Sequence, residues 1–138
     1  MLLALIGVAG CGARDTGPAM IPVTGEVSFN GHPVSGADVS FLPSKGASDA
    51  APAQAVTDEA GRFEVVSVFD RGRTTRAGMT SGHYTVTVTQ LEQSPATANL
   101  SRPPKNLLPA KYAAAVSSGL VAEVTPDGKN HFAFELSK

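Results

Sequence analysis

Hydrophobic and polar residues alternate along most of the chain with a period of two, which is typical of strands that bury one face. The clearest run is at 84–89, where Tyr84, Val86 and Val88 alternate with three threonines. Runs of the same kind lie at 23–29, 37–41, 54–57, 63–65, 120–124 and 132–136. The pattern predicts an all-β fold, a seven-stranded antiparallel β-sandwich of two sheets.

Turn residues separate these runs. Asn30-Gly31 predicts a tight turn, and the segment 58–61 predicts another in which Gly61 supplies a positive φ. Asp127-Gly128 predicts a hairpin between the last two strands. Gly25 falls on the apolar side of the first run, where it suggests a bulge. Strands and turns of this kind favour antiparallel pairing throughout.

Two connections are longer than these turns. The first, at 70–81, is expected to be a loop and carries Arg71, Arg73 and Arg76. The second, at 92–118, holds four prolines and has a stretch at 110–115 that suits one or two helical turns. The two loops together could hold a ligand or a partner.

The aromatic residues indicate which face of each strand is buried. Five phenylalanines fall on the apolar side of their runs, namely Phe29, Phe41, Phe63, Phe132 and Phe134. Burying one such ring contributes about 1.5–3 kcal/mol to folding. We therefore expect them to form a core, the alternative being an exposed aromatic platform for binding.

Length and charge limit the classes of function. With 138 residues, the chain is long enough for one domain with its own core. The net charge is −1, so no strong field is available to recruit nucleic acid. We expect no cofactor and no nucleic-acid partner.

The only cysteine, Cys11, follows an apolar stretch and ends the run Val8-Ala9-Gly10-Cys11. This arrangement resembles a bacterial lipobox, in which the thiol receives a diacylglyceryl group and the preceding segment is removed. Signal segments usually open with positive charge, whereas no Lys or Arg precedes Arg14 here. The alternatives are an ordinary cleaved secretory signal and a structural cysteine buried in an N-terminal strand.

The lipobox implies an order of segments. Residues 1–10 would be a lipoprotein signal segment, 11–21 a flexible tether and 22–138 the folded domain. Lipidation at Cys11 would place the domain on the extracytoplasmic side of the cell membrane or of the outer membrane. The membrane is then a partner through the lipid anchor, and an envelope protein or polymer is a further candidate.

The region from Val23 to Val88 resembles the carboxypeptidase regulatory-like domain, a small transthyretin-like β-sandwich. The matching segments are 23–27, 30–41, 57–65 and 81–88, and the last third is similar to bacterial envelope lipoproteins that carry such a domain. These domains are mostly non-catalytic modules for spacing, folding or adhesion. The resemblance therefore implies a fold and no active site.

The sequence disfavours two enzymatic relatives of this general fold. The hydroxyisourate hydrolases end in Tyr-Arg-Gly-Ser, whereas this chain ends in Glu-Leu-Ser-Lys. Intradiol dioxygenases bind iron with two tyrosines and two closely spaced histidines. The chain has residues of both types but no His-x-His, the candidates being Tyr84, Tyr112, His32, His83 and His131.

Other chemistry finds little support in the sequence. A serine-hydrolase elbow, a zinc-protease helix motif and a phosphate-binding loop are all absent. Asp58, Glu59 and Asp127 offer fewer oxygens than the six to eight that calcium usually takes. The chain has no Trp for stacking on sugars, and the sequon at Asn99 carries no weight in a bacterial protein.

The sequence therefore predicts a membrane-anchored extracytoplasmic lipoprotein with a non-catalytic β-sandwich, in a structural or interaction role at the cell envelope. The main alternative is a ligand- or partner-binding module that uses the loops 70–81 and 92–118. A small enzyme with a non-haem iron or hydrolytic site is the least favoured class. No catalytic or metal-binding residue is assigned, and Cys11 is the one site residue, for lipidation.

Overall fold

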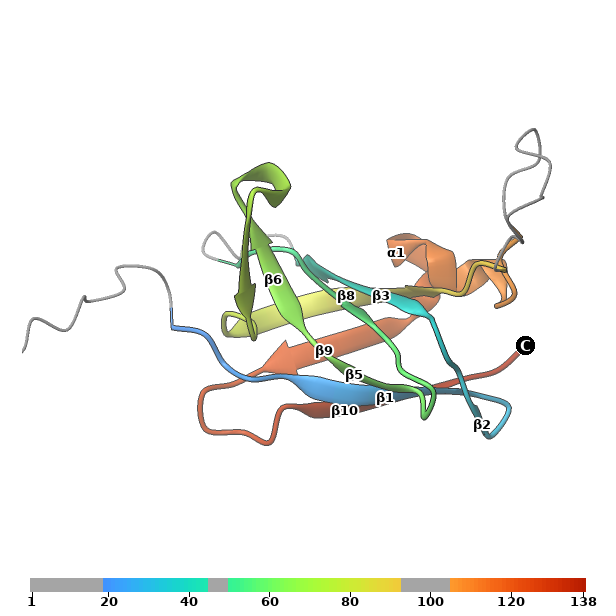
Figure 1. The fold of residues 1–138 in the computed structure, drawn as a ribbon. Helices are drawn as coiled ribbons and strands as arrows, with labels where there is room; N and C mark the ends of the chain where they lie inside the picture. Colours follow the sequence, from blue (N-terminus) through green and yellow to red (C-terminus); the bar gives the residue numbers. More distant parts are fainter. Residues whose placement is uncertain (1–18, 45–49, 93–104) are drawn as a thin grey trace, which may run out of the picture.

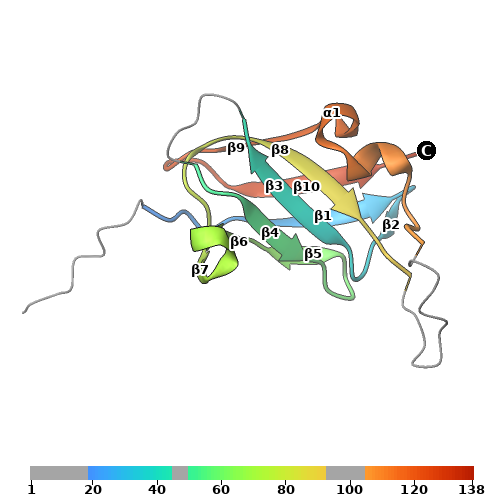
Figure 2. The same ribbon diagram turned by 90° about the horizontal axis from the view of Figure 1, so that it is seen from above.

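Two β-sheets pack around a shared core in the computed structural model, which describes residues 19–44, 50–92 and 105–138 (Figures 1 and 2). The smaller sheet contains β1 (Thr24–Phe29), β2 (His32–Pro33), β5 (Arg62–Glu64) and β10 (His131–Leu136). The larger sheet has the order β7 (Thr74–Ala77), β6 (Val66–Phe69), β4 (Ala53–Val56), β3 (Asp38–Pro43), β8 (Gly82–Thr89) and β9 (Leu120–Val124). The domain is all-β and sandwich-like.

The first and last strands pair in parallel. β1 and β10 stay in register from Thr24 opposite His131 to Phe29 opposite Leu136. The expectation that every pairing is antiparallel is wrong at this pair. The reason is topological, since β9 pairs with β8 in the larger sheet and the chain then crosses to the smaller one.

This crossing also corrects the hairpin predicted at Asp127-Gly128. The segment 125–130 joins strands of different sheets, so the turn there does not close a hairpin. The amide side chain of Asn130 holds it together. Its Nδ2 donates to the Thr125 carbonyl at 2.8 Å, and its Oδ1 accepts from the Thr125 N–H at 3.1 Å.

The predicted loop at 70–81 contains a strand. β7 pairs with β6 from Phe69 opposite Thr74 to Ser67 opposite Arg76, with η1 (Asp70–Gly72) at the tip of the hairpin. β7 buries no residue, so it lacks the alternation by which a strand is recognised in sequence. The expectation of an unstructured loop is wrong here for that reason.

The other predicted turns are confirmed. Asn30 and Gly31 have φ values of 50° and 83° and join β1 to β2. Gly61 has a φ of 76°. Asp58 shapes this second turn, because its Oδ1 accepts from the N–H groups of Ala60 and Arg62, both at 2.9 Å.

Gly25 makes room for an aromatic ring and forms no bulge. The register of β1 runs unbroken through Gly25 against Phe63 on one side and Phe132 on the other. A Cβ at this position would collide with the Phe63 ring and the Phe132 carbonyl. The predicted bulge is therefore wrong, and close packing explains the glycine.

The phenylalanines line the core, as the alternation predicts. Phe41, Phe63 and Phe134 are buried and form a triangle with ring centroids 6.1–6.3 Å apart. Phe29 and Phe132 are partly buried and pack against it. This arrangement contradicts an exposed aromatic platform and confirms the inward faces of the strands.

Tyr84 anchors the start of β8 from inside the core. Its hydroxyl donates to the Thr80 carbonyl at 2.7 Å and pairs with the Thr80 hydroxyl at the same distance. A buried tyrosine that bonds back a few residues upstream is the tyrosine corner found in Greek-key sandwiches. Burial raises the pKa of Tyr84, and the hydrogen bond to Thr80 opposes this in part.

The described end of the second long connection packs beside β8. It contains η2 (Ala110–Ala113) and α1 (Ala115–Ser118), close to the one or two helical turns expected at 110–115. The Tyr112 hydroxyl accepts from the Ser137 N–H and donates to the Ser137 carbonyl, both at 3.0 Å. These bonds join η2 to the chain just beyond β10. Neither helix, nor any other in the described ranges, is long and apolar enough to cross a membrane.

Candidate functional site

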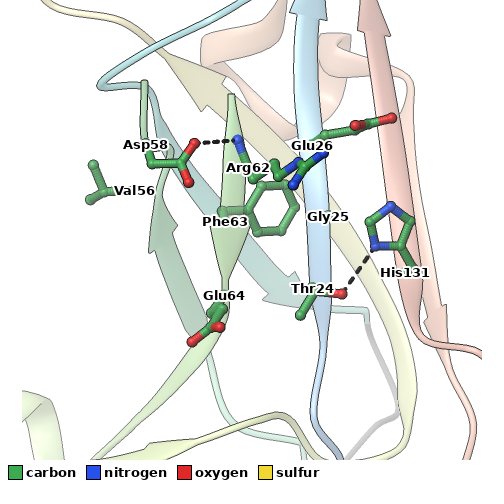
Figure 3. Close-up of a pocket in the computed structure, with 9 residues that line it drawn as sticks. All are labelled: Thr24, Gly25, Glu26, Val56, Asp58, Arg62, Phe63, Glu64 and His131. Atoms are coloured by element: carbon green, nitrogen blue, oxygen red, sulfur yellow. Dashed lines mark hydrogen bonds between the residues drawn. The ribbon is translucent and has the colours of Figure 1, made fainter. Parts of the chain in front are cut away.

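A hollow of about 610 Å³ lies on the smaller sheet (Figure 3). Outward-facing polar side chains from three adjacent strands line it, and Val56 and Asp58 close one side. The lining residues are Thr24, Gly25, Glu26, Val56, Asp58, Arg62, Phe63, Glu64 and His131.

Strand register brings these side chains together. Thr24 lies opposite His131 on one side and Glu64 on the other, and Glu26 lies opposite Arg62. The Thr24 hydroxyl and His131 Nδ1 are hydrogen-bonded at 3.0 Å, in an exposed setting. Cross-strand pairs of this kind stabilise a sheet, so part of this polarity has a structural role.

The hollow carries negative charge. Its carboxylates are those of Glu26, Asp58 and Glu64, and Arg62 is the one permanent cation among its lining residues, which leaves a balance of −2 with His131 neutral. Such a surface offers oxygen acceptors to a cationic or hydroxyl-rich partner. The Thr24–His131 pair is exposed and joins the two parallel strands β1 and β10 at this edge of the hollow.

A second polar surface is the tip of the β6–β7 hairpin. Asp70, Arg71 and Arg73 surround a hollow of about 370 Å³. Asp70 and Arg71 have positive φ values of 51° and 56°, which are uncommon for residues other than glycine. The Asp70 carboxylate accepts from the Thr74 hydroxyl at 3.2 Å, which helps to hold this tight turn.

The two loops expected to bind together lie at opposite ends of β8. The hairpin returns to the sheet just before Gly82, whereas Leu107 donates its N–H to the carbonyl of Gln90, just past the other end. Eight extended residues separate the two points by roughly 26 Å. In the described residues, therefore, the loops 70–81 and 92–118 form no common site.

The candidate iron ligands are spread over four elements. His32 lies in β2, His83 and Tyr84 in β8, Tyr112 in η2 and His131 in β10. Both tyrosine hydroxyls are occupied by hydrogen bonds, to Thr80 and to Ser137. A Ser137 N–H that donates to its hydroxyl lowers the pKa of Tyr112.

Metal ligands do not converge elsewhere in the described part of the chain either. Of the candidate calcium ligands, Asp58 and Glu59 belong to the turn before β5, and Asp127 belongs to the crossing before β10. Asp58 uses its carboxylate to hold that turn. Among residues 19–44, 50–92 and 105–138, no three His, Cys, Asp or Glu side chains are grouped to hold a metal ion.

Cys11 and the segment before it lie outside the described residues, as does Asn99, so the lipobox stays a prediction. The structure does locate the point where the expected tether meets the domain. Ile21, its last residue, pairs with Met79, with both backbone hydrogen bonds at 2.8 Å. Among the described residues, strand pairing therefore begins at Ile21, one residue before the predicted domain boundary at 22.

The outer-face hollow was not recognised from the sequence. Its polar residues are the outward-facing residues of strands whose inward-facing residues form the core. The alternation along each strand does not reveal which strands are neighbours. Knowledge of the pairing of β1 with β5 and β10 would have placed Thr24, Glu64 and His131 together.

Comparison with models of protein families, with curated proteins and with solved structures finds no match to this chain.

Proposed function

We propose that this protein is a membrane-anchored extracytoplasmic lipoprotein whose non-catalytic, transthyretin-like domain has a structural or interaction role at the cell envelope. The observation that carries the proposal is the run Val8-Ala9-Gly10-Cys11 after an apolar stretch. Small residues before the cysteine give a peptidase access to the bond, and only a thiol forms the thioether. Two or more acyl chains hold a protein stably at a membrane.

The geometry of the domain agrees with attachment through its N-terminal side. The chain enters the sandwich through the segment before β1 (Figure 1), where Ile21 bridges to Met79. The ten residues 12–21 reach at most about 35 Å when extended. A tether of that length would keep the domain close to the bilayer while leaving both sheets exposed to partners.

A binding role is favoured by the hollow on the smaller sheet. It combines a balance of −2 with an exposed valine, Val56, and it lies on regular strands that hold its side chains in fixed positions. These features suit a cationic or hydroxyl-rich segment of an envelope partner. The partner-binding alternative is thereby moved from the two long loops to this face.

The anchoring proposal is tested by replacing the thiol. Cys11→Ser should give an uncut or mislocalised protein, whereas the wild type should be recovered in the membrane fraction and in the detergent phase. Thr16→Ser, further along the tether, is the matched control and should behave as the wild type. Wild-type protein found wholly in the aqueous phase, with its signal removed elsewhere, would contradict the proposal.

A further inference from the structure

The β6–β7 hairpin stands out from the sandwich beside the point where the tether enters. It rises above the sheets in Figure 1, and its tip points toward the viewer in Figure 2. Met79, which pairs with Ile21, follows β7 after a single glycine. The base of the hairpin therefore lies beside Ile21, where the tether joins the domain.

The hairpin is positively charged although the whole chain carries −1. Arg71 and Arg73 are exposed, and Arg76 is partly buried in β7. Asp70 is the only acidic residue in the segment 66–79, which leaves a balance of +2. The Asp70 carboxylate accepts from Thr74, so it is turned back toward its own hairpin.

We propose that this hairpin binds the anionic headgroups of the bilayer to which the protein is tethered, as a second membrane contact. The proposal rests on the proposed lipid anchor at Cys11. Guanidinium groups suit phosphate oxygens, because their planar donors can bind two oxygens at once. The tight turn at Asp70 and Arg71 presents Arg71 and Arg73 together at the tip.

The lengths of the two segments are compatible with this contact. From Met79 to Thr74, where the tip begins, is five residues, or roughly 17 Å at the rise of an extended strand. Residues 12–21, which follow Cys11, span at most about 35 Å when extended. The arginines at the tip can therefore arrive at the plane of the headgroups while the lipid stays in the bilayer. Lipid chains together with a basic patch are a common two-signal form of membrane attachment.

A soluble anionic polymer of the envelope would offer similar phosphate or carboxylate chemistry. The position of the hairpin favours the lipid, because the tether brings headgroups within reach at high local concentration. The acidic hollow on the smaller sheet would disfavour a long polyanion that wraps around the domain. The polymer is therefore treated as an outcome that would overturn the proposal.

The test measures binding of the full chain carrying Cys11→Ser to vesicles of phosphatidylcholine, with and without about a third of phosphatidylglycerol. Residues 1–13 contain no charged side chain, so their apolar contribution cancels in the ratio of the two affinities. Without the thiol, the result is independent of whether the protein is lipidated. Failure of the anchor and failure of this contact are thus distinguishable.

We expect the parent chain to bind the anionic vesicles more tightly than the neutral ones, and we expect salt to weaken this preference. In the double variant Arg71→Glu with Arg73→Glu, the ratio of the two affinities should fall at least about tenfold. The matched control is Lys105→Glu with Lys138→Glu. This pair changes the net charge equally, but at exposed positions that lie beyond the ends of β8 and β10. This control should keep most of the preference. Arg71→Lys with Arg73→Lys should keep it as well, and all variants should melt like the parent protein.

Equal losses for the arginine pair and the lysine pair would overturn the proposal, because net charge alone would then explain the binding. A preference insensitive to salt would overturn it too. The proposal would also be overturned if soluble polyphosphate bound the parent chain as tightly as the anionic vesicles do and this binding required the same arginines. The hairpin would then recognise a polymer.

Discussion

Ile21 and Met79 exchange two backbone hydrogen bonds, each 2.8 Å long, and so form an isolated bridge at the edge of the sandwich. Gly78, the residue before Met79, packs so closely that a Cβ there would lie 2.6 Å from the Ile21 carbonyl oxygen. Met79 itself is fully buried. The bridge therefore fixes where the N-terminal segment enters the domain and sets the β6–β7 hairpin beside it.

Gly25→Ala should destabilise the domain by about 1–3 kcal/mol, because the new Cβ would overlap the Phe63 ring. Phe63→Leu alone should also destabilise it by losing ring packing. In the double variant the smaller side chain relieves the overlap with the ring but not the close approach to the Phe132 carbonyl, so the double variant should lose less stability than the sum of the two single losses. Urea unfolding of the four proteins measures this coupling, and strict additivity would contradict the close packing.

Gly61→Val should cost about 2–4 kcal/mol. A β-branched residue is strained at a φ of 76°, and its Cβ would lie 2.7 Å from the Val27 carbonyl oxygen. Gly36→Val is the control, since Gly36 has a φ of 69° but nothing within 4 Å of its Cβ position. It should cost roughly 1–2 kcal/mol, from backbone strain alone. Thermal melts that rank the two variants equally would show that crowding at Gly61 is unimportant.

Phe134→Asp should destabilise the protein by about 4 kcal/mol or more, because it places an unpaired charge between Phe41 and Phe63. Glu135→Ala, at the next and exposed position, should change stability by no more than about 0.5 kcal/mol. Chemical denaturation of both variants compares the two faces of β10. Similar effects would mean that the register of β10 is misplaced.

Tyr84 should make the domain less stable in alkali. Burial raises its pKa above 10.0, so the folded state holds the phenolic proton at a pH where the unfolded chain releases it. Its contribution is therefore complete below about pH 10 and is lost as the pH rises further. Tyr84→Phe should remove this part of the decline while costing about 1 kcal/mol at neutral pH, from the lost bonds to Thr80.

Tyr112→Phe is the control for that pH dependence. The pKa of Tyr112 is lowered, chiefly by its hydrogen bond with the Ser137 backbone, so its stabilisation increases as the pH approaches 10 from below. Replacing Tyr112 should therefore leave the loss of stability above pH 10 unchanged. Unfolding free energies measured between pH 8 and about 11.5 compare the two variants. A Tyr84→Phe protein with an unchanged alkaline decline would contradict the assignment to Tyr84.

The sequence predicts the strands that bury one face. It does not predict strands without buried residues, or which strands pair with each other. Val86 and Val88 are inward and fully buried, as their alternation indicates. β7 was missed because none of its residues is buried. The parallel pairing of Thr24 with His131 depends on the crossing of the chain at 125–130, which no local pattern encodes.

The two candidate binding surfaces, the hairpin tip and the hollow on the smaller sheet, also differ in how far the sequence predicts them. Arg71 and Arg73 could be singled out from the sequence because charge clustering is local. The hollow that joins Glu64 to His131 could not, because these residues are far apart in the chain and meet only through β1. Gly25 is a third case. The sequence shows that a glycine interrupts the apolar side of β1, but only the structure shows that the Phe63 ring occupies the space of its missing side chain.

The central claim is that Cys11 carries a lipid, and the mass of the mature protein tests it most directly. Protein purified from the membrane fraction of cells that express the full chain should begin at Cys11. Its N-terminal peptide should be heavier than the sequence by a diacylglyceryl group, with or without a further acyl chain. A peptide that begins elsewhere, or a Cys11 with a free thiol, would contradict the account.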